Sequence, residues 1–334
     1  MNAMNESLFF LLNKTINIKE VDSNFSNFEI KKIYTPFKIN SFFYFFFYLL
    51  SFFKTLFNEK DTFYHFHNAQ MSSAFLTKKN INNSLITIHG FPSYERFMNS
   101  SNFSVVKKMH YLFFKRIELM QLKLSSVDKR SIDKIKKCFN VDLPFYCIPN
   151  CCENNFFGLN KNRVVKFTFV GAIDDNKGVE EILEAFCRVD KDYELHIFGS
   201  GDKLYNLLNK YTHKNNIIFY GSVQRSEILK LFPKFDVFIS FSKTEGFSMS
   251  FIEALASGLA IITTNWGDVK DYVQGNGFMI EREINILQNT ITKLIEMESN
   301  LLNEMKMKSV DIFNNKLRPS IISSKYMDIY EKKI

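Results

Sequence analysis

The chain has 334 residues, of which 46% are hydrophobic and 23% charged, and these values are typical of a globular protein. This composition excludes a disordered or fibrous chain, and at ~100 to 200 residues per domain the length favours two domains. Lys and Arg exceed Asp and Glu by eight, so phosphates, nucleic acids and acidic lipid headgroups are the favoured partners.

The cysteines give no sign of a metal site or a disulfide framework. They are odd in number, form no CxxC pair and have no His at zinc spacing, which favours a reducing compartment. No basic, apolar and small-residue cleavage pattern opens the chain, so we expect a cytoplasmic protein. The five residues are Cys138, Cys147, Cys151, Cys152 and Cys187.

Ser41–Phe57 is an aromatic and almost uncharged segment. It is shorter than the ~20 residues that a spanning helix needs, and it contains Lys54. We expect a buried or sheet-covering helix, and a membrane-spanning helix is the least favoured interpretation. The alternative is a helix at the inner face of the plasma membrane, because aromatic helices with flanking basic residues lie in bilayer interfaces.

The rest of the first half shows alternating strand and helix patterns. Strands are predicted at Thr62–Phe66, Ser84–Ile88 and Phe145–Ile148, and helices near Val105–Met120 and Asp128–Phe139.

From Val164 the alternation becomes regular. A helix after Lys177 places apolar residues at three- and four-residue spacing, which indicates packing against a sheet. This βαβ pattern predicts a parallel sheet that binds ligands at the carboxyl ends of its strands. The predicted strands are Val164–Val170, Glu194–Phe198, Asn216–Tyr220, Asp236–Ser240 and Leu259–Thr263.

Phe241–Gly258 (FSKTEGFSMSFIEALASG) joins a strand to a helix through a small, polar loop whose amides can face an anion. Glu253 lies on a helix that is apolar nearly all round, so its carboxylate needs a partner. Glu245 lies eight residues earlier, and both carboxylates could flank one bound molecule. Alternatively, Glu245 caps the helix start and Glu253 pairs with a neighbouring basic residue.

The segment EGFSMSFIEALASGLAIITTNWGD resembles the donor-site signature of the retaining glycosyltransferases called group 1 or family four. Val170-Gly171, Asn176-Lys177-Gly178, HIFGSGDKL and IIFYGSVQRSEILKLF are similar to further segments of that family, in order, over roughly residues 160 to 280. HFHNAQ, TIHGFP and IPN in the first half are similar to its strand ends and hinge. The resemblance implies the GT-B fold, in which two Rossmann-like domains face each other across a cleft.

The resemblance also implies residue roles. Glu253 would bond the donor ribose, and Lys177 would neutralise the leaving phosphate without a metal, as a cation beside a helix N-terminus can. Glu245 would hold the transferred sugar, and His89 would touch it from the other domain. The remaining implied donor contacts are Gly171, Val223 beside the base, Gly246, Phe247, Ser248, Met249 and Ser250.

Two segments depart from the family pattern. Ala172-Ile173-Asp174-Asp175 stands where the family usually has an Arg, so phosphate stabilisation would be weaker or supplied elsewhere. Asn150-Cys151-Cys152-Glu153 replaces the common Asn-Gly.

Two further patterns carry little weight. His65 and His67 share one face of a strand but have no third metal ligand, so we expect packing or acceptor contact. Gly199-Ser200-Gly201 begins a dinucleotide fingerprint, but Leu204 occupies the third Gly position.

By resemblance, residues 1–155 would form an acceptor-binding domain, residues 156–318 a nucleotide-sugar-binding domain, and residues 319–334 a helix returning to the first. The chain would transfer a sugar, with retention, from a UDP- or GDP-linked donor to a glycan or lipid-linked oligosaccharide in bacterial surface polysaccharide synthesis. No cofactor and no metal would be needed. The oligomeric state is not predicted.

The alternatives are a non-catalytic GT-B partner or nucleotide-binding subunit, and a GT-B epimerase or phosphorylase. A nucleic-acid-binding protein is disfavoured, because no recognisable reader motif is present.

Overall fold

The computed structural model describes residues 7–12, 29–34, 64–66, 84–89, 104–156, 158–159, 164–211 and 213–331. The chain divides into a unit of residues 1–62 and a unit of residues 63–334, which are considered separately. In the first unit, β1 (Ser7–Leu12) pairs in parallel with β2 (Glu29–Tyr34), with Ser7 opposite Glu29. These strands were not predicted, and Ser41–Phe57 lies outside the described residues.

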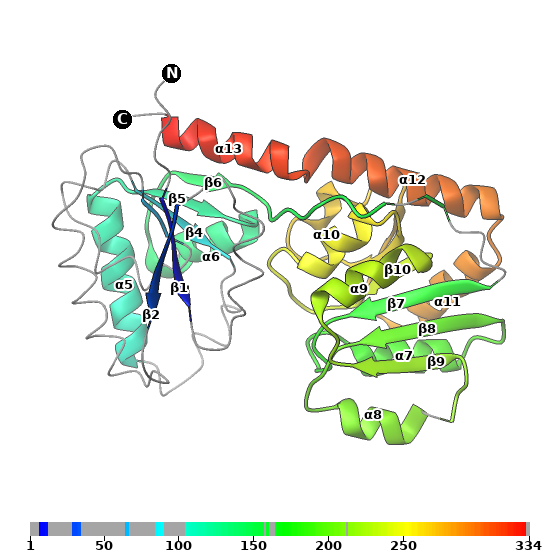
Figure 1. Ribbon diagram of the computed structural model, residues 1–334. Helices are drawn as coiled ribbons and strands as arrows, with labels where there is room; N and C mark the ends of the chain where they lie inside the picture. The colour runs from blue at the N-terminus through cyan, green and yellow to red at the C-terminus, as the bar shows by residue number, and fades with distance from the viewer. Residues whose placement is uncertain are drawn as a thin grey trace. The chain divides into compact units, whose positions relative to one another are not determined.

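The second unit contains a six-stranded parallel sheet in the order β12-β11-β10-β7-β8-β9 (Figure 1). The chain runs outward from β7 to β9, then returns to β10 and runs outward on the other side. This reversal creates a topological switch point between β7 and β10, where sheets of this kind bind ligands. The strands are β7 Val165–Val170, β8 Tyr193–Phe198, β9 Ile217–Gly221, β10 Val237–Ser240, β11 Ala260–Thr264 and β12 Gly277–Ile280.

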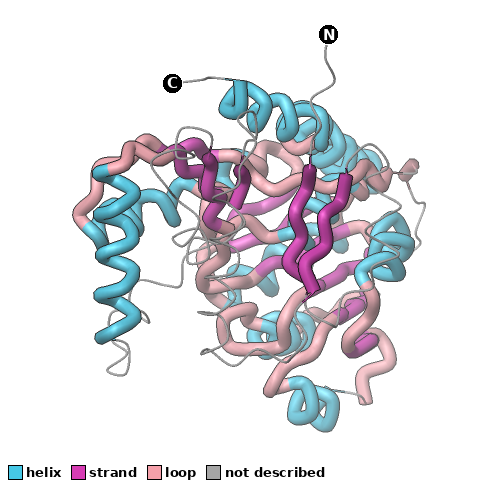
Figure 2. The backbone as a smooth tube through the Cα atoms, turned by 60° about the vertical axis from the view of Figure 1, so that its left-hand side comes forward, coloured by secondary structure: helices cyan, strands magenta, loops and turns pink. Residues whose placement is uncertain are grey.

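Helices and strands alternate along this part of the chain (Figure 2). The helices are α7 Val179–Cys187, α8 Leu204–Tyr211, α9 Arg225–Leu231, α10 Met249–Ala256, α11 Ile284–Ile295 and α12 Ser299–Lys316, with single 3₁₀ turns η3 at Phe232–Lys234 and η4 at Val269–Asp271. The six-stranded sheet has a hydrophobic core on each face, because successive side chains of a strand point to opposite sides. Ile239 of β10 packs with α7 and α11, whereas Phe238 packs with α10 and α12.

A smaller parallel sheet in the second unit has the order β3-β4-β5-β6. Helices α5 (Ser104–Leu119) and α6 (Lys129–Phe139) cover one face, where Phe114 stacks on Phe139 with ring centroids 4.6 Å apart. Helix α13 (Pro319–Glu331) packs on the other face through Ile322 and Ile329 (Figure 1). The strands are β3 Tyr64–Phe66, β4 Ser84–Ile88, β5 Lys123–Ser126 and β6 Phe145–Cys147.

Polar contacts fix α13 on this sheet. His65 on β3 lies 2.7 Å from the Tyr330 hydroxyl through Nδ1 and 2.6 Å from Thr87 Oγ1 through Nε2. The chain of contacts continues to Ser125 on β5, and the buried Lys123 ammonium donates to the Ile329 carbonyl at 3.2 Å. Strands β3, β4 and β5 are thereby tied to residues more than two hundred positions away.

A buried ion pair fixes α12 on the larger sheet. Lys306 Nζ lies 2.7 Å from Asp236 Oδ1, and the two side chains are only 3% and 5% exposed. The second oxygen of Asp236 accepts the Lys166 amide at 3.0 Å. The ion pair therefore joins α12 to the segment before β10 and to the start of β7.

The predicted strands from Val164 to Thr263 are confirmed to within one residue at either end, as are the two predicted helices of the first half. Within the strand predicted at 62–66, the described residues 64–66 form β3. The strand predicted at 145–148 ends at Cys147, and β5 and β12 were not predicted. The described part of the chain contains no helix that combines the length and the apolar character needed to cross a bilayer. The domain boundaries at 155 and 318 stay predictions.

Candidate donor-binding site

The carboxyl ends of β7, β8 and β9 come together through glycines. The Gly171 amide donates to the Phe198 carbonyl at 3.0 Å, and the Gly199 amide donates to Gly221 at 2.8 Å. A Cβ at Gly199, where φ is 140°, would lie 1.8 Å from the Gly171 carbonyl oxygen. Gly199 is therefore required for close packing of two backbone segments, which explains the incomplete dinucleotide pattern.

Lys177 and Glu245 form an ion pair at the switch point between β7 and β10. Lys177 lies just before α7 and Glu245 in the loop after β10, and the Lys177 ammonium contacts Glu245 Oε1. The Ser242 hydroxyl donates to the same oxygen at 2.8 Å. The Lys177 stem passes beside Gly171, where a Cβ would lie 3.7 Å from its Cδ atom. The structure thus brings Lys177, Glu245 and Gly171 together.

The loop from Gly246 to Ser250 leads into the first turn of α10, with Ser248 at the N-cap. Phe247 is buried, and its ring packs on Tyr272 with centroids 4.9 Å apart. Gly246 is supported by Gly267, where a Cβ would lie 2.5 Å from the Gly246 carbonyl oxygen. Met249 and Ser250 begin the helix and are partly exposed. The loop is therefore anchored by one aromatic side chain, while its small residues remain at the surface.

Glu253 is buried on α10 and pairs with Arg225. Its Oε1 lies 2.5 Å from Arg225 Nε, and the two side chains are 6% and 61% exposed. Burial raises the pKa of the Glu253 carboxyl, and the Arg225 guanidinium opposes that rise. Val223 precedes Arg225 in the loop after β9, so the ion pair brings the predicted base-binding loop next to the predicted ribose-binding carboxylate. Two interpretations of Glu253 followed from the sequence, binding of a ligand or pairing with a neighbouring basic residue. The ion pair with Arg225 corresponds to the second.

Asn150 links His89 to the loop before α10. His89 follows β4 and hydrogen-bonds the Asn150 side chain. The Asn150 amide group donates to the Phe247 carbonyl at 3.1 Å. Desolvation lowers the pKa of the His89 imidazole, which favours its neutral form at pH 7. His89 is thus connected to the donor loop through one side chain.

The segment that replaces the family's Arg has its own set of contacts. Asp174 accepts the Lys177 amide at 2.9 Å, and this bond orients the backbone just before α7. Asp175 pairs with Lys203, which also reaches Glu180 of α7 at 3.2 Å. Arg282 bonds the Phe241 carbonyl at 3.0 Å and Glu181 at 2.6 Å. Lys203 and Arg282 therefore support the start of α7 by pairing with acidic groups.

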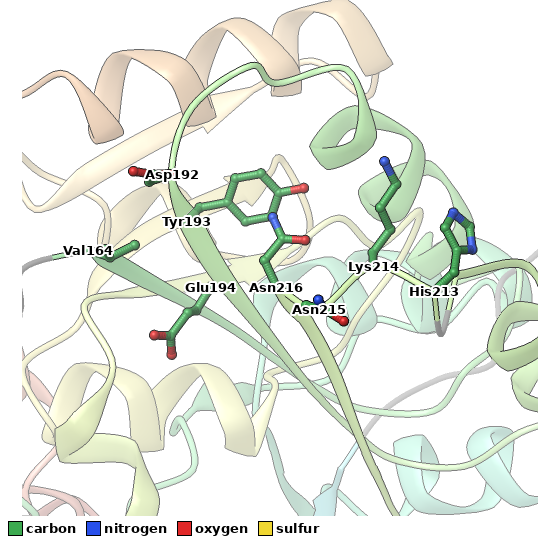
Figure 3. Close-up of a pocket in the computed structure, with 8 residues that line it drawn as sticks. All are labelled: Val164, Asp192, Tyr193, Glu194, His213, Lys214, Asn215 and Asn216. Carbon is green, nitrogen blue, oxygen red and sulfur yellow. The ribbon is translucent and has the colours of Figure 1, made fainter.

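A shallow pocket of about 440 Å³ lies elsewhere on the larger sheet (Figure 3). Tyr193 and Asn216 in its wall stand at the amino ends of β8 and β9, opposite the edge that carries Gly171 and Glu245. It is therefore separate from the predicted donor site. Its lining residues are Val164, Asp192, Tyr193, Glu194, His213, Lys214, Asn215 and Asn216.

Arg225 and Ser242 were not identified as site residues from the sequence. It was also not predicted that Asn150 bridges His89 and the Phe247 carbonyl. Arg225 lies two residues after Val223, and Ser242 three before Glu245, so proximity to predicted residues was the available signal. Their partners depend on the tertiary fold. The roles assigned to all the site residues stay predictions. His65 has Thr87 and Tyr330 as partners, and His67 lies outside the described residues.

Residues 153–309 match the sequence profile of the glycosyl transferases group 1 family. This segment belongs to that family. The predicted resemblance is thereby confirmed for the segment that carries the donor-site signature.

Relatives of this glycosyl transferases group 1 segment include the O-antigen biosynthesis glycosyltransferase WbnH of Escherichia coli, which is 29% identical over 122 residues, 36% of this chain and 35% of WbnH. A 41.2 kDa protein in the cps region of Klebsiella pneumoniae is 25% identical over 55% of this chain and 50% of its own. The matches span about a third to a half of these relatives.

The crystal structure of Anabaena HepE in complex with UDP and glucose is similar in fold, with a TM-score of 0.74 at 12% identity. The similarity covers 98% of this chain and 91% of HepE. The predicted GT-B fold, with two Rossmann-like domains, is confirmed by this likeness.

Proposed function

We propose that this chain is a glycosyltransferase that takes a sugar from a nucleotide-sugar donor bound at the carboxyl ends of β7 and β10. The observation that carries the proposal is the Lys177–Glu245 ion pair at the switch point, inside a segment of the glycosyl transferases group 1 family. A UDP- or GDP-linked donor fits this site, and UDP is favoured because the similar HepE structure contains it.

The donor would be held by polar groups that the structure places around one edge of the sheet. Departure of a nucleoside diphosphate creates negative charge, which the Lys177 ammonium and the amides at the start of α10 can stabilise. Glu245 then exchanges its contact with Lys177 for the transferred sugar, and Glu253 accepts bonds from ribose hydroxyls. These groups supply the required charge without a metal, and no protein nucleophile is needed for a transfer with retention.

The acceptor is proposed to be a glycan or a lipid-linked oligosaccharide in bacterial surface polysaccharide synthesis. The similarity to an O-antigen enzyme and to a protein of a cps region supports this assignment. The acceptor would approach from the side of His89, which lies at the end of β4 and is tied to the donor loop through Asn150. The proposed site of action is the cytoplasm.

A non-catalytic partner subunit is the second candidate, and Ala172 is the observation that favours it. The family usually places an Arg at that position, and the nearby cations Lys203 and Arg282 are paired with acidic groups. Lys177 is also paired, with Glu245, so it would have to give up that contact to meet a diphosphate. Such a subunit would bind a nucleotide without transferring a sugar.

The test is a thermal-stability titration with UDP, GDP and the matching nucleotide sugars, because a ligand that binds only the native state raises its melting temperature. We expect stabilisation by one nucleotide class. Glu253→Ala should weaken its binding by about tenfold to a hundredfold, the value of bonds to a charged group. Glu227→Ala, an exposed carboxylate on α9, is the matched control and should bind as the wild type does.

Turnover separates the two candidates. Release of nucleoside diphosphate from the bound donor, with an acceptor extract present, supports the enzyme, and Glu245→Ala should depress turnover more than binding. Activity that persists in a chelator and a product with the donor's anomeric configuration would support the finer mechanism. Binding without release would favour the partner subunit, and no nucleotide binding at all would overturn both.

A further inference from the structure

The pairing of β7 with β10 stops short of the two loops that carry Lys177 and Glu245. The last paired residues of the two strands are Thr168 and Phe238. Each strand continues for two more residues before its loop begins. Paired parallel strands are joined by evenly spaced hydrogen bonds, and this ladder ends before the loops are reached. Contacts outside the sheet therefore set the separation of the loops and the position of the Lys177–Glu245 pair.

Arg282 joins the two loops from a third part of the sheet. It lies in the short connection between β12 and α11, and its Nε atom donates to the Phe241 carbonyl directly after β10, at 3.0 Å. Its Nη2 atom donates to the Asp175 carbonyl in the loop after β7 at 3.2 Å, and to Glu181 of α7 at 2.6 Å. A guanidinium is planar and presents its donors in a rigid fork, so it holds these acceptors at a fixed spacing.

The surroundings of Arg282 are shaped to a guanidinium. Gly178, the N-cap of α7, has a φ of 70°, and a Cβ there would lie 2.9 Å from Arg282 Nη2 and 2.7 Å from the Phe241 carbonyl oxygen. The buried Phe241 ring packs against the guanidinium, with 5.5 Å between its centroid and Arg282 Cζ. The Arg282 side chain is only 21% exposed. The absence of a side chain at Gly178 therefore leaves room for the contact that joins the loops.

Two further contacts link the same loops. The Asn176 carbonyl accepts the Lys243 amide at 2.8 Å, and the Asn176 side chain donates to the Thr244 carbonyl at 3.0 Å. Asn176 and Thr244 directly precede Lys177 and Glu245 in the chain. The Lys177–Glu245 ion pair is itself the other link. One of the links between the loops is thus made by the two residues that are expected to change partners during the reaction.

We propose that Arg282 is a positioning residue for sugar transfer, a role that rests on the proposed function of the donor site. When Glu245 exchanges Lys177 for the transferred sugar, the ion pair no longer holds the loops together. Arg282 then keeps the Lys177 ammonium beside the leaving diphosphate and the Glu245 carboxylate beside the sugar, because it bonds the backbone of both loops. Its loss should therefore affect turnover more than the binding of UDP, which carries no sugar for Glu245.

The first test compares Arg282 variants in the release of nucleoside diphosphate from the donor. Arg282→Gln should lower turnover by about tenfold to a hundredfold, the value of hydrogen bonds from a charged group, with a much smaller change in UDP affinity. Arg282→Lys keeps the charge but not the fork, so it should also lose about tenfold. Full turnover in Arg282→Lys would show that charge alone acts and would refute a positioning role.

Arg188→Gln is the matched control. Arg188 lies at the other end of α7, where its guanidinium bonds Glu184 and Asn285 and its side chain is 42% exposed. This variant removes one guanidinium from the same helix, far along the chain from both loops, and should turn over as the wild type does. Equal losses of turnover in Arg188→Gln and Arg282→Gln would mean that any weakening of α7 has the same effect, which would also refute the proposal.

A double-variant comparison separates positioning from a general loss of stability. If Arg282 acts through Glu245, Arg282→Gln should lower the residual turnover of Glu245→Ala by much less than it lowers that of the wild type. Independent structural damage would instead multiply the two losses. A full tenfold or greater loss in the Glu245→Ala background would therefore count against the proposal.

Hydrogen exchange provides a measurement that does not need turnover. The Lys177 amide is bonded to Asp174 and the Lys243 amide to Asn176. Both amides should exchange about tenfold faster in Arg282→Gln, whereas amides in the middle of α10 should keep their wild-type rates. Unchanged exchange of both amides would show that Arg282 does not hold the loops. Absence of nucleoside diphosphate release by the wild type would instead overturn the proposed donor function, so the two failures are distinguishable.

Discussion

The two sheets of residues 63–334 are both parallel and both covered by helices. Different kinds of polar contact fix the covering helices on each sheet. The larger sheet carries a buried ion pair, Lys306–Asp236, and a ligand edge made of close-packed glycines. The smaller sheet is joined to α13 by bonds among His65, Thr87 and Tyr330. The first arrangement fixes α12 and brings backbone segments together at the edge of the proposed donor site, and the second holds α13 by contacts between residues far apart in the chain.

The difference also shows what local sequence can encode. A Gly at a positive φ, a Lys before a helix and a Glu in a strand-to-helix loop have roles that depend on their neighbours in sequence. The contacts of His65 and Lys123 depend on a helix that comes two hundred residues later. Local sequence therefore predicts most strands and helices of both sheets, but it does not predict the contacts that hold α13 on the smaller sheet.

The largest expected effect breaks the ion pair of the larger sheet. Lys306→Met leaves Asp236 charged and buried, which typically costs about 3–5 kcal/mol of unfolding free energy. Urea denaturation measures this change in the free energy of unfolding. Lys308→Met, an exposed position on the same helix, should lose less than about 0.5 kcal/mol. A loss below about 1 kcal/mol in Lys306→Met would show that α12 is not held by this pair.

The second effect tests whether the two sheets act together in catalysis. Asn150→Ala removes the link between His89 and the Phe247 carbonyl, and we expect turnover to fall about tenfold, the value of one well-placed hydrogen bond. UDP affinity should change much less, because the Asn150 side chain meets only the carbonyl side of the loop. Asn300→Ala, exposed on α12, is the control. Equal turnover in both variants would leave Asn150 a purely structural residue.

Elements with a strong local sequence pattern were predicted correctly, and elements that depend on distant contacts were missed. The strands from Val165 to Thr264 were predicted nearly to the residue, because alternation of apolar runs and amphipathic helices is a strong signal. Strand β5 (KLSS) was missed because it is short and carries Lys and Ser, which are buried only through contacts with β4 and α13. The pairing of Lys177 with Glu245 could be expected from their positions at neighbouring strand ends. The sequence allowed a basic partner for Glu253, but only the folded structure identifies that partner as Arg225.

The third effect is smaller and concerns the attachment of α13. Tyr330→Phe removes the hydroxyl that meets His65 Nδ1 at 2.7 Å, and we expect a loss of about 1 kcal/mol in unfolding free energy. Tyr111→Phe, at an exposed position on α5, should be neutral and serves as the matched control. If both variants unfold at the same urea concentration as the wild type, packing alone holds α13.

The smallest effect at neutral pH concerns Arg225. Among the described residues, Arg225 is the one side chain that the structure pairs with the buried Glu253 carboxylate. Burial raises the pKa of Glu253 and Arg225 lowers it, so Arg225→Gln should raise it further. Ribose hydroxyls need the ionised carboxylate as acceptor, so UDP affinity declines as pH falls through this pKa. In Arg225→Gln the decline should begin at a higher pH.

The guanidinium is 61% exposed and screened by water, so UDP affinity near pH 8 should stay within about threefold of wild type. Calorimetric titrations with UDP from about pH 5 to pH 8 bracket the ionisation of a carboxyl with a raised pKa. Arg225→Lys retains the charge and should keep a profile close to wild type. Superimposable profiles for Arg225→Gln and the wild type would mean that Glu253 stays ionised without its partner, in which case the polar groups of α10 suffice to hold the charge.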